Sequence, residues 1–288
     1  MNDRFGLGWR PELAAGILSN LDRIDIVEVI ADDYFDAPKA KRRALKTLAT
    51  QVPVALHGVT LGLASSVAVE TRQLDQLARL VDEIQPEFWS EHLAFVRGGG
   101  IEIGHLAAPP RTEATIEGTV RNLTRAKAIV GTKPLVENVA TLIEPPGSKL
   151  SEAKWTCQIL AAANCDLLLD LHNLYANSVN FSFDPYDYID RIPREQIRVI
   201  HLAGGQWIQA KSTDERRLLD DHLHDVPETV YRLLEYVGEK TSHPLTVILE
   251  RDGRYPPTAV LLNQLDRARE AVRRGRAKQL TKVAPEAA

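Results

Sequence analysis

The stretch CDLLLDLHN, residues 165–173, decides the fold of this chain. Leu167 to Leu169 form an apolar run with no alternation, which is typical of a parallel strand buried on both faces. The run leads directly into Asp170, followed by His172 and Asn173. An unpaired carboxylate is unstable in an apolar interior, so Asp170 is expected at the strand's end, where it meets water or a metal ion.

The same pattern recurs along the chain, and it predicts eight strands that alternate with helices. The strands are expected at Phe5–Trp9, Ile24–Ile30, Val52–His57, Phe88–Ala94, Pro134–Val139, the opening stretch, Ile197–Leu202 and Leu245–Glu250. Helices are expected at 11–21, 39–50, 69–84, 112–130, 151–163, 185–191, 226–238 and from Pro257 onward. Residues 97–110 and 205–221 read as loops.

Eight such units in one chain of 288 residues predict an α/β fold, a single (β/α)₈ TIM barrel. We expect the barrel domain to span residues 1–280 and residues 281–288 to form a disordered tail. The alternative, a doubly wound open sheet, favours a glycine-rich phosphate turn after its first strand, and FGLGWRP is not that motif.

The composition excludes several classes of function. The net charge is −4, so nothing in the overall charge indicates a nucleic-acid partner. The two cysteines, Cys157 and Cys165, make no CxxC pair, which argues against a disulfide framework or a thiolate zinc site. No apolar stretch is long enough for a membrane span and the N-terminus has no signal core, so we expect a cytoplasmic protein without a membrane partner.

Metal-ligand side chains gather at the predicted strand ends. In a (β/α)₈ barrel these ends converge on one face, where the active site is built. The residues found there, or in the loop after the seventh strand, are Glu28, His57, Glu91, His92, Glu137, Asn138, Asp170, His172, Asn173, His201, Asp220, Asp221, His222 and Glu250. Crowded carboxylates repel one another unless cations lie between them, so the pattern predicts a metal site.

The ligand types narrow the choice of metal. Oxygen and imidazole ligands without thiolate suit iron, manganese or zinc, and so many donors require more than one ion. Of the neighbours Glu91 and His92 only one should face the barrel centre, and we favour His92, with Glu91 bracing a nearby loop. Whether His172 faces the barrel centre stays undecided, because side chains alternate between the two faces of a strand only as far as the strand continues.

The motifs HGV, SEHL, VENV, LLLDLHN, HLAG, an Asp-x-His loop and ERD follow one another in this order. From about Gly6 to Pro256 this succession resembles the multinuclear non-heme iron-dependent oxidases, a TIM-barrel family related to xylose isomerase. The family includes the methanobactin-maturing and 3-thiaglutamate-pathway oxidases.

The resemblance implies a set of metal ligands and a reaction. The implied ligands are His57, His92, Glu137, Asp170, Asn173, His201, Asp220, His222 and Glu250. Among them Glu137 is expected to bridge two irons, and His57, Glu137, Asp170 and His201 are the expected catalytic residues. The cofactor would be two or three iron ions with a mixed Fe(II)/Fe(III) pair as the active form. An oxidant formed from O₂ would remove hydrogen from the β-carbon of a substrate cysteine.

The implied partners are a cysteine-containing ribosomal precursor peptide and a protein that recognises its leader or carrier segment. Two positions depart from the family pattern: Gly205 stands where many members have a second histidine, and His172 where many have asparagine. Both departures bear on which cysteine modification results.

Two other functions are compatible with the same ligand types. A divalent-metal hydrolase or isomerase, similar to the abasic-site zinc endonucleases or the sugar isomerases, would use no O₂. A binding module would hold ions only as a structural cage and would show no redox change with thiol and air.

Overall fold

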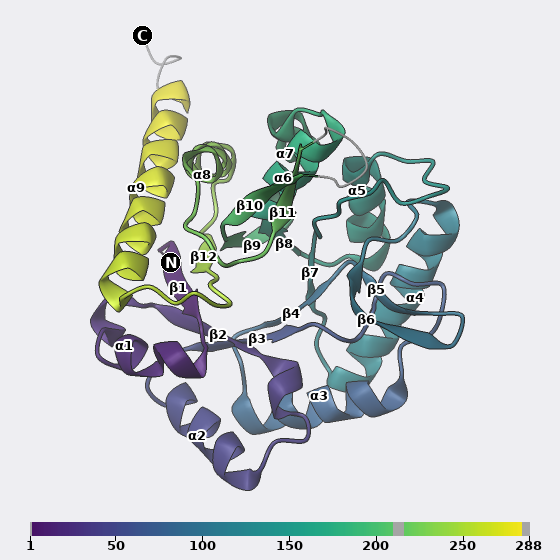
Figure 1. Cartoon of the computed structure of the whole chain (residues 1–288), viewed down its shortest axis with the longest axis horizontal. Helices are drawn as coiled ribbons and strands as arrows, with labels where there is room; N and C mark the ends of the chain where they lie inside the picture. The colour runs from purple at the N-terminus through teal and green to yellow at the C-terminus, as the bar shows by residue number, and fades with distance from the viewer. Residues whose placement is uncertain (1, 210–215, 284–288) are drawn as a thin grey trace. The chain divides into compact units, whose positions relative to one another are not determined.

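Eight apolar runs of the sequence form the parallel strands of one closed barrel in the computed structural model, which describes residues 2–209 and 216–283 (Figure 1). The order around the barrel is β1-β12-β9-β8-β7-β4-β3-β2. The predicted (β/α)₈ architecture is therefore confirmed. The barrel strands are β1 (Arg4–Gly8), β2 (Ile26–Ile30), β3 (Val54–Gly58), β4 (Trp89–His92), β7 (Leu135–Glu137), β8 (Leu167–Asp170), β9 (Ile197–Leu202) and β12 (Thr246–Leu249).

Helices connect the strands. The α-helices are α1 (Ala14–Leu18), α2 (Lys39–Ala49), α3 (Thr71–Ile84), α4 (Glu113–Val130), α5 (Glu152–Ala163), α6 (Leu171–Phe181), α7 (Pro185–Arg191), α8 (Glu228–Lys240) and α9 (Thr258–Val283). Short 3₁₀ helices lie at Pro11–Leu13, Leu21–Arg23, Ala31–Tyr34 and Arg194–Gln196. Local signals set several boundaries: the Thr112 side chain caps α4, and Gly131, with φ 91°, ends it.

The chain divides into two compact units, Ile26–Leu168 and Met1–Asp25 with Leu169–Ala288. We call the first the inner-sequence unit and the second the terminal unit. The prediction of a single domain over residues 1–280 stays a prediction.

In the inner-sequence unit, β2 pairs with β3, β3 with β4, β4 with β7 and β7 with β8, all in parallel. The helices α2, α3 and α4 lie outside β2, β3 and β4 (Figure 1). The strand interiors are apolar and buried on both faces, as at Val27, Leu56 and Val136. This two-sided burial explains why the strands read as continuous apolar runs.

In the terminal unit, β12 pairs in parallel with β1 on one side and with β9 on the other. Helices α8 and α9 lie side by side, and each carries fully buried side chains, such as Leu233 on α8 and Leu265 on α9. Strand burial follows the same pattern, with Ile200 and Val247 at 0% exposure.

Two expected loops form hairpins, and a helix begins inside the stretch expected as the sixth strand. The hairpin of β5 (Phe95–Gly98) and β6 (Ile101–Ala107) occupies most of 97–110. Within 205–221 the chain forms the hairpin β10 (Gly205–Gln209) and β11 (Arg216–Asp220). Helix α6 begins directly after Asp170, because the Asp170 side chain accepts a hydrogen bond from the Asn173 amide and caps the first turn.

At the C-terminal end, α9 continues to Val283. Residues 284–288, the rest of the predicted disordered tail, lie outside the described residues. Among the described residues, no helix combines the length and the apolar character that crossing a membrane would require.

Candidate metal centre

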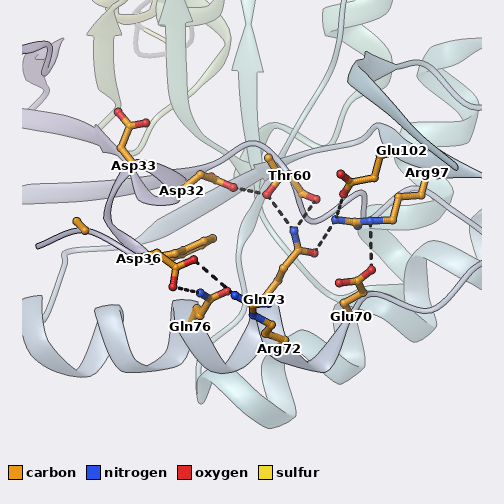
Figure 2. Close-up of a pocket in the computed structure, with 12 residues that line it drawn as sticks. Asp32, Asp33, Asp36, Thr60, Glu70, Arg72, Gln73, Gln76, Arg97 and Glu102 are labelled. Carbon is orange, nitrogen blue, oxygen red and sulfur yellow. Dashed lines mark hydrogen bonds and ion pairs between the residues drawn. The ribbon is translucent and has the colours of Figure 1, made fainter.

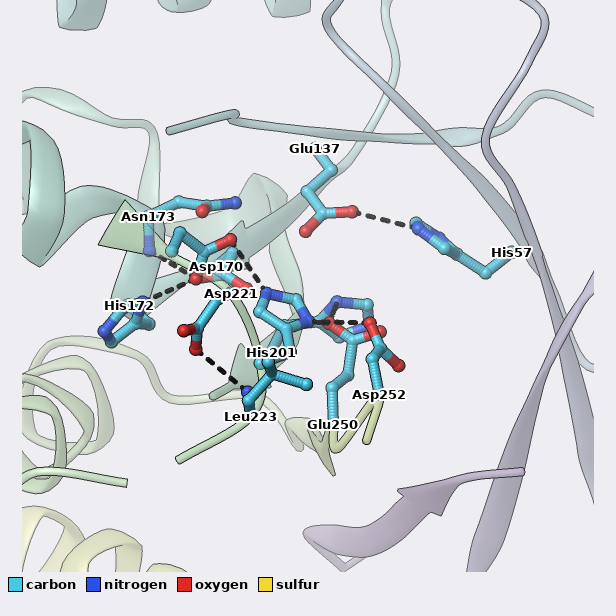
Figure 3. A network of polar contacts seen from close by, with 12 residues as sticks. His57, Glu137, Asp170, His172, Asn173, His201, Asp221, Leu223, Glu250 and Asp252 are labelled. Atoms are coloured by element: carbon cyan, nitrogen blue, oxygen red, sulfur yellow. Dashed lines mark hydrogen bonds and ion pairs between the residues drawn. The ribbon is translucent and has the colours of Figure 1, made fainter. Parts of the chain in front are cut away.

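Three ligand side chains of the inner-sequence unit converge at strand ends. His57 lies on β3, His92 ends β4 and Glu137 ends β7. The Nε2 atoms of both histidines lie 3.4 Å from the same oxygen, Oε2 of Glu137 (Figure 3 shows the His57 contact). The two imidazole rings are 4.6 Å apart, and one ligand atom from each residue lies within 4.8 Å of the others. We call this group the His57 cluster; it is a three-residue site suited to a cation.

Hydrogen bonds fix the orientation of both imidazoles. His92 Nδ1 donates to the Gly58 carbonyl at 3.1 Å, and His57 Nδ1 lies 2.8 Å from Oγ of Ser90. A histidine whose Nδ1 is engaged in this way presents Nε2 as its ligand atom. In both histidines it is Nε2 that points at Glu137.

Glu91 has the bracing role expected for it. Its Oε2 accepts a hydrogen bond from the Leu61 amide at 3.1 Å, in the loop after β3, and its side chain is fully buried. The close fit requires glycine at residue 58, because a Cβ there would lie 2.7 Å from Glu91 Oε2. His92, the alternate neighbour, faces Glu137 instead.

A second group forms in the terminal unit at the ends of β8, β9 and β12. Asp170, His201 and Glu250 each offer a ligand atom within 4.8 Å of the others, and all three are at most 5% exposed. His201 Nδ1 lies 3.0 Å from Glu250 Oε2 (Figure 3). Asp170 Oδ1 accepts the Asn173 amide at 2.6 Å, which fixes the carboxylate in place. We call this group the His201 cluster.

His222 and Asp220 form a network beside the His201 cluster. His222 Nε2 lies 2.9 Å from Asp220 Oδ2, and its Nδ1 lies 3.5 Å from Glu250 and 3.3 Å from Asp252. His172 Nδ1 lies 2.6 Å from the other oxygen of Asp220. His222 adopts the left-handed conformation, φ 55°, which is uncommon for a residue with a side chain and marks a constrained position.

The charges in this network stabilise one another. Burial by itself lowers the pKa of His222, but the carboxylates of Asp220 and Glu250 outweigh it and raise that pKa well above its usual value. Burial likewise raises the pKa of Asp220, and the opposing effect of His222 and His172 lowers it overall. A proton or a metal cation can therefore provide the positive charge that these carboxylates need.

The structure brings six of the nine predicted ligands into the two clusters, namely His57, His92, Glu137, Asp170, His201 and Glu250. Asp220 and His222 are outside the His, Cys, Asp and Glu groups found among the described residues, although His222 contacts Glu250 and Asp220. The Asn173 amide donates to Asp170, and the role of all three residues as ligands stays a prediction. Glu28 is buried on its strand and is also outside these groups, and Asn138 is buried just after β7.

Sequence reasoning missed the residues that orient the ligands. Ser90 and the Gly58 carbonyl hold the histidines from a neighbouring strand, 33 and 34 positions away in sequence. Asp252 follows Glu250 in the ERD motif and contacts His222. Ser90 and His92 are two residues apart, which places both side chains on the same face of β4. This spacing was the one available sequence signal for the role of Ser90.

The donor sets of both clusters fit a metal. They contain imidazole nitrogen and carboxylate oxygen and no sulfur, the combination that suits iron, manganese or zinc. A bound cation stabilises buried carboxylates. Cys165 is 4% exposed and contributes to neither cluster.

A separate polar cavity of about 470 Å³ lies in the inner-sequence unit (Figure 2). Its charges pair with one another: Arg97 contacts Glu70 at 3.4 Å and Glu102 at 2.8 Å, and Asp32 accepts the Val59 amide. The Arg97–Glu70 pair attaches the β5–β6 hairpin to the start of α3, and the Asp32–Val59 hydrogen bond holds the loop after β3. The charged residues that line the cavity are therefore explained by the contacts that hold these segments together.

Comparison with known proteins gives a consistent family. Residues 4–273 match the model of the family described as "RiPP precursor modification enzyme MbnB/TglH/ChrH". A UPF0276 protein of Caulobacter vibrioides is 31% identical over 275 residues, which cover 95% of this chain and 96% of that protein. A UPF0276 protein of Bordetella bronchiseptica is 32% identical over 272 residues, covering 94% of this chain and 93% of that protein.

Solved structures share the fold at low sequence identity. Endonuclease IV from Thermus thermophilus aligns with a TM-score of 0.60 at 17% identity, over 93% of this chain and 99% of that one. A structure of L-ribulose 3-epimerase aligns with a TM-score of 0.62 at 14% identity, over 99% of both chains. At these identities the likeness concerns the barrel alone.

Proposed function

Because this chain belongs to the MbnB/TglH/ChrH family of enzymes that modify RiPP precursors, we propose that it is a multinuclear non-heme iron-dependent oxidase. RiPPs are ribosomally synthesised and post-translationally modified peptides. In the proposed reaction the enzyme uses O₂ to modify cysteine residues of such a peptide. The first step is removal of a hydrogen atom from the cysteine β-carbon.

The observation that carries the proposal is the pair of buried imidazole–carboxylate clusters at strand ends. A (β/α)₈ enzyme takes its catalytic residues from the ends of several strands. We assign iron-binding roles to the His57 cluster and to the His201 cluster, with two or three ions in the protein. Asn173, Asp220 and His222 belong to the proposed ligand set as well.

Iron is the metal proposed because the reaction is an oxidation. Bound iron supplies redox chemistry with O₂, which zinc cannot provide. The protein's part is to hold the ligand atoms ready: Ser90 and Gly58 orient the two histidines of the His57 cluster, and the first turn of α6 fixes Asp170. Such fixed ligands leave little reorganisation for the reaction itself.

The proposed substrate is a peptide cysteine, and the chain's own Cys165 offers little competition. Burial raises the pKa of the Cys165 thiol to about 12, so this thiol stays protonated and unreactive. A partner protein that recognises the leader or carrier segment of the precursor is part of the proposal.

Metal analysis after anaerobic purification, combined with Mössbauer spectra, tests the proposal. We expect two or three irons per chain and a mixed-valent signal, with O₂ uptake when a cysteine-bearing precursor peptide is added. Zinc alone at full occupancy in an iron-replete preparation would contradict the oxidase and favour the divalent-metal hydrolase or isomerase.

Replacing Glu137 by alanine tests the proposed bridging ligand. Glu137→Ala removes the carboxylate on which both histidines of the His57 cluster converge, so iron content and turnover should fall together, by about tenfold or more. The matched control is Glu144→Ala, because Glu144 is 54% exposed and pairs with Arg111. Full iron content and turnover in Glu137→Ala would show that the bridging assignment is wrong.

A further inference from the structure

The hairpin β10–β11 in the terminal unit has two outer edges that differ in their backbone hydrogen bonding. This difference indicates a binding surface. Strand β10 carries the sequence GQWIQ and pairs antiparallel with β11, so that Trp207 lies opposite Leu218 and Gly205 opposite Asp220. Each strand has one side that faces its partner and one that faces away from it.

The outer edge of β11 is already occupied by a side chain of α6. The Leu218 amide donates to Oδ1 of Asn180 at 2.8 Å, and Nδ2 of Asn180 donates to the Leu218 carbonyl at 3.0 Å. Asn180 thus imitates a neighbouring strand. Because both backbone groups of Leu218 point away from β10, Trp207 and Leu218 form a non-hydrogen-bonded pair of the antiparallel ladder.

Within residues 2–209 and 216–283, the opposite edge of β10 pairs with no other strand. Hydrogen-bonded and non-hydrogen-bonded pairs alternate along an antiparallel ladder, so Gly205 and Gln209 belong to the same class as Trp207. The N–H and C=O groups of all three residues therefore point away from β11. Among the residues that the structure describes, the backbone of these three makes no hydrogen bond to another segment. This edge offers a row of donors and acceptors about 13 Å long, from the rise of a strand.

The open edge lacks the features that normally prevent strand pairing. Edge strands are usually interrupted by charges, proline or bulges. β10 has none of these, whereas strand β5 of the other hairpin carries Arg97 and has a register shift against β6 between Phe95 and Arg97. The contrast indicates that β10 is kept suitable for pairing.

The open edge begins at the His201 cluster's network. Gly205 lies so close to His172 that a Cβ on it would come within 2.6 Å of the ring, and Asp220, opposite Gly205, contacts both His172 and His222. An extended chain that pairs with β10 would therefore have its Gly205 end next to candidate metal ligands.

We propose that an extended segment of the precursor peptide adds to the open edge of β10 as a further strand, with its cysteine at the Gly205 end. This inference rests on the proposed function, because a peptide substrate is the occupant to which it commits. Backbone hydrogen bonds supply the affinity in such strand addition, and pockets for alternate side chains supply the specificity. Trp207, 45% exposed with Arg216 5.1 Å from its ring, provides an apolar surface for one such side chain.

A pair of variants at Gln209 tests the edge. The Gln209 amide faces away from β11, so Gln209→Pro removes one edge donor and blocks the approach of a strand without breaking the β10–β11 ladder. Gln209→Ala, the matched control, keeps the donor. The probe is a pool of 13-residue synthetic peptides with a fixed central cysteine, from which the tightest binder to the iron-loaded enzyme is selected under argon.

The selected peptide should bind Gln209→Pro about tenfold more weakly than Gln209→Ala, the loss typical of one backbone hydrogen bond. Amide hydrogen exchange of the wild type provides a second measurement that needs no variant. Peptide should slow exchange at Trp207 and Gln209 about tenfold and leave Leu218, already bonded to Asn180, unchanged.

Four results would overturn the inference: no binder at millimolar peptide, equal affinity of the two variants, protection that appears on β5–β6 instead, or a dimer in light scattering that Gln209→Pro abolishes. The last result would assign the edge to a second copy of the chain. Binding is measured without O₂, so the oxidase proposal and the docking proposal can fail separately. Iron content and O₂ uptake test the first, and the variant pair tests the second.

Discussion

Gly205 and His172 share a space that holds only one side chain. A Cβ on Gly205 would lie 2.1 Å from the Leu219 carbonyl oxygen and 2.6 Å from Cε1 of His172. The two positions at which the sequence was expected to depart from the family's pattern are thus neighbours in space. The sequence showed each departure separately, and their contact could not be predicted because it depends on the unpredicted β10–β11 hairpin.

Gly205→Ala should therefore destabilise the protein. Overpacking of this kind costs about 1–3 kcal/mol, since neither the backbone carbonyl nor the His172 ring, held by Asp220, can move easily. Urea unfolding measures the change in the free energy of unfolding. In the control Gly98→Ala, the new Cβ would meet only Phe95, at 3.8 Å, and the change should stay below about 0.5 kcal/mol. Equal stability of both variants would contradict the packing described.

Cys165 should resist alkylation in the folded protein. Burial raises the pKa of its thiol from 9.0 to about 12, so at pH 8 the thiolate fraction is about a thousandfold lower than in an ordinary cysteine. Iodoacetamide labelling followed by mass spectrometry should modify half-buried Cys157 first and Cys165 only in urea.

The same shift predicts a pH dependence of stability with a definite sign. The folded state holds the Cys165 proton more tightly than the unfolded state, so the contribution is complete below about pH 9 and is lost as pH rises toward 12. Cys165→Ser should remove that part of the alkaline decline. Rapid labelling of Cys165 in the native protein at pH 8 would show that the thiol is more accessible than its burial indicates.

At the scale of elements, the sequence predicted barrel strands well and the inserted elements poorly. Strands such as β8 and β9 are buried on both faces and therefore read as apolar runs. Strands β6 and β10 of the two hairpins have no buried residue, so they lack the continuous apolar run that identifies a barrel strand. Helix α6, LHNLYANSVNF, has weak helix formers, and its cap is Asp170, a residue that sequence reasoning had assigned to the metal.

Asn180→Ala should destabilise the β10–β11 hairpin more than the barrel strands. Asn180→Ala removes both hydrogen bonds to the Leu218 backbone and leaves a buried N–H and C=O unsatisfied, a loss of about 1–3 kcal/mol. Exchange of the Leu218 amide should accelerate, while amides in β12 keep their protection. Asn263→Ala, at an exposed position of α9, is the control. Unchanged exchange at Leu218 would mean that another group protects this edge.

At the scale of the whole molecule, the alternation of strands and helices was sufficient to predict the closed barrel and the type of side chain at its strand ends. The six residues of the two clusters were all among the predicted ligands. The orienting partners were not, because they depend on the register between strands that are distant in sequence. His57 meets Ser90 only because β3 pairs with β4 in that register. Sequence periodicity identifies a strand but does not set its register against a neighbour.

Arg276, on the C-terminal helix α9, ties the two ends of the chain together within the terminal unit. Its guanidinium donates to Asp3 at 2.8 Å, just before β1, and to the His243 carbonyl at 2.6 Å, just before β12. Asp3 also accepts the Leu245 amide, so one contact network secures the starts of two paired strands. Arg276→Ala should lower the free energy of unfolding by about 2–3 kcal/mol, because charge-assisted hydrogen bonds in a half-buried site are lost together.

Arg273→Ala is the matched control for this prediction. Arg273 lies one turn earlier on α9, is 72% exposed and pairs with Glu270 three residues before it, so its removal should change stability by less than about 0.5 kcal/mol. Amide exchange should locate the effect of Arg276→Ala in β1 and β12 first, because those strands lose their shared anchor. If both arginine variants unfold at the same denaturant concentration, the ends of the barrel are held by strand pairing and apolar packing alone.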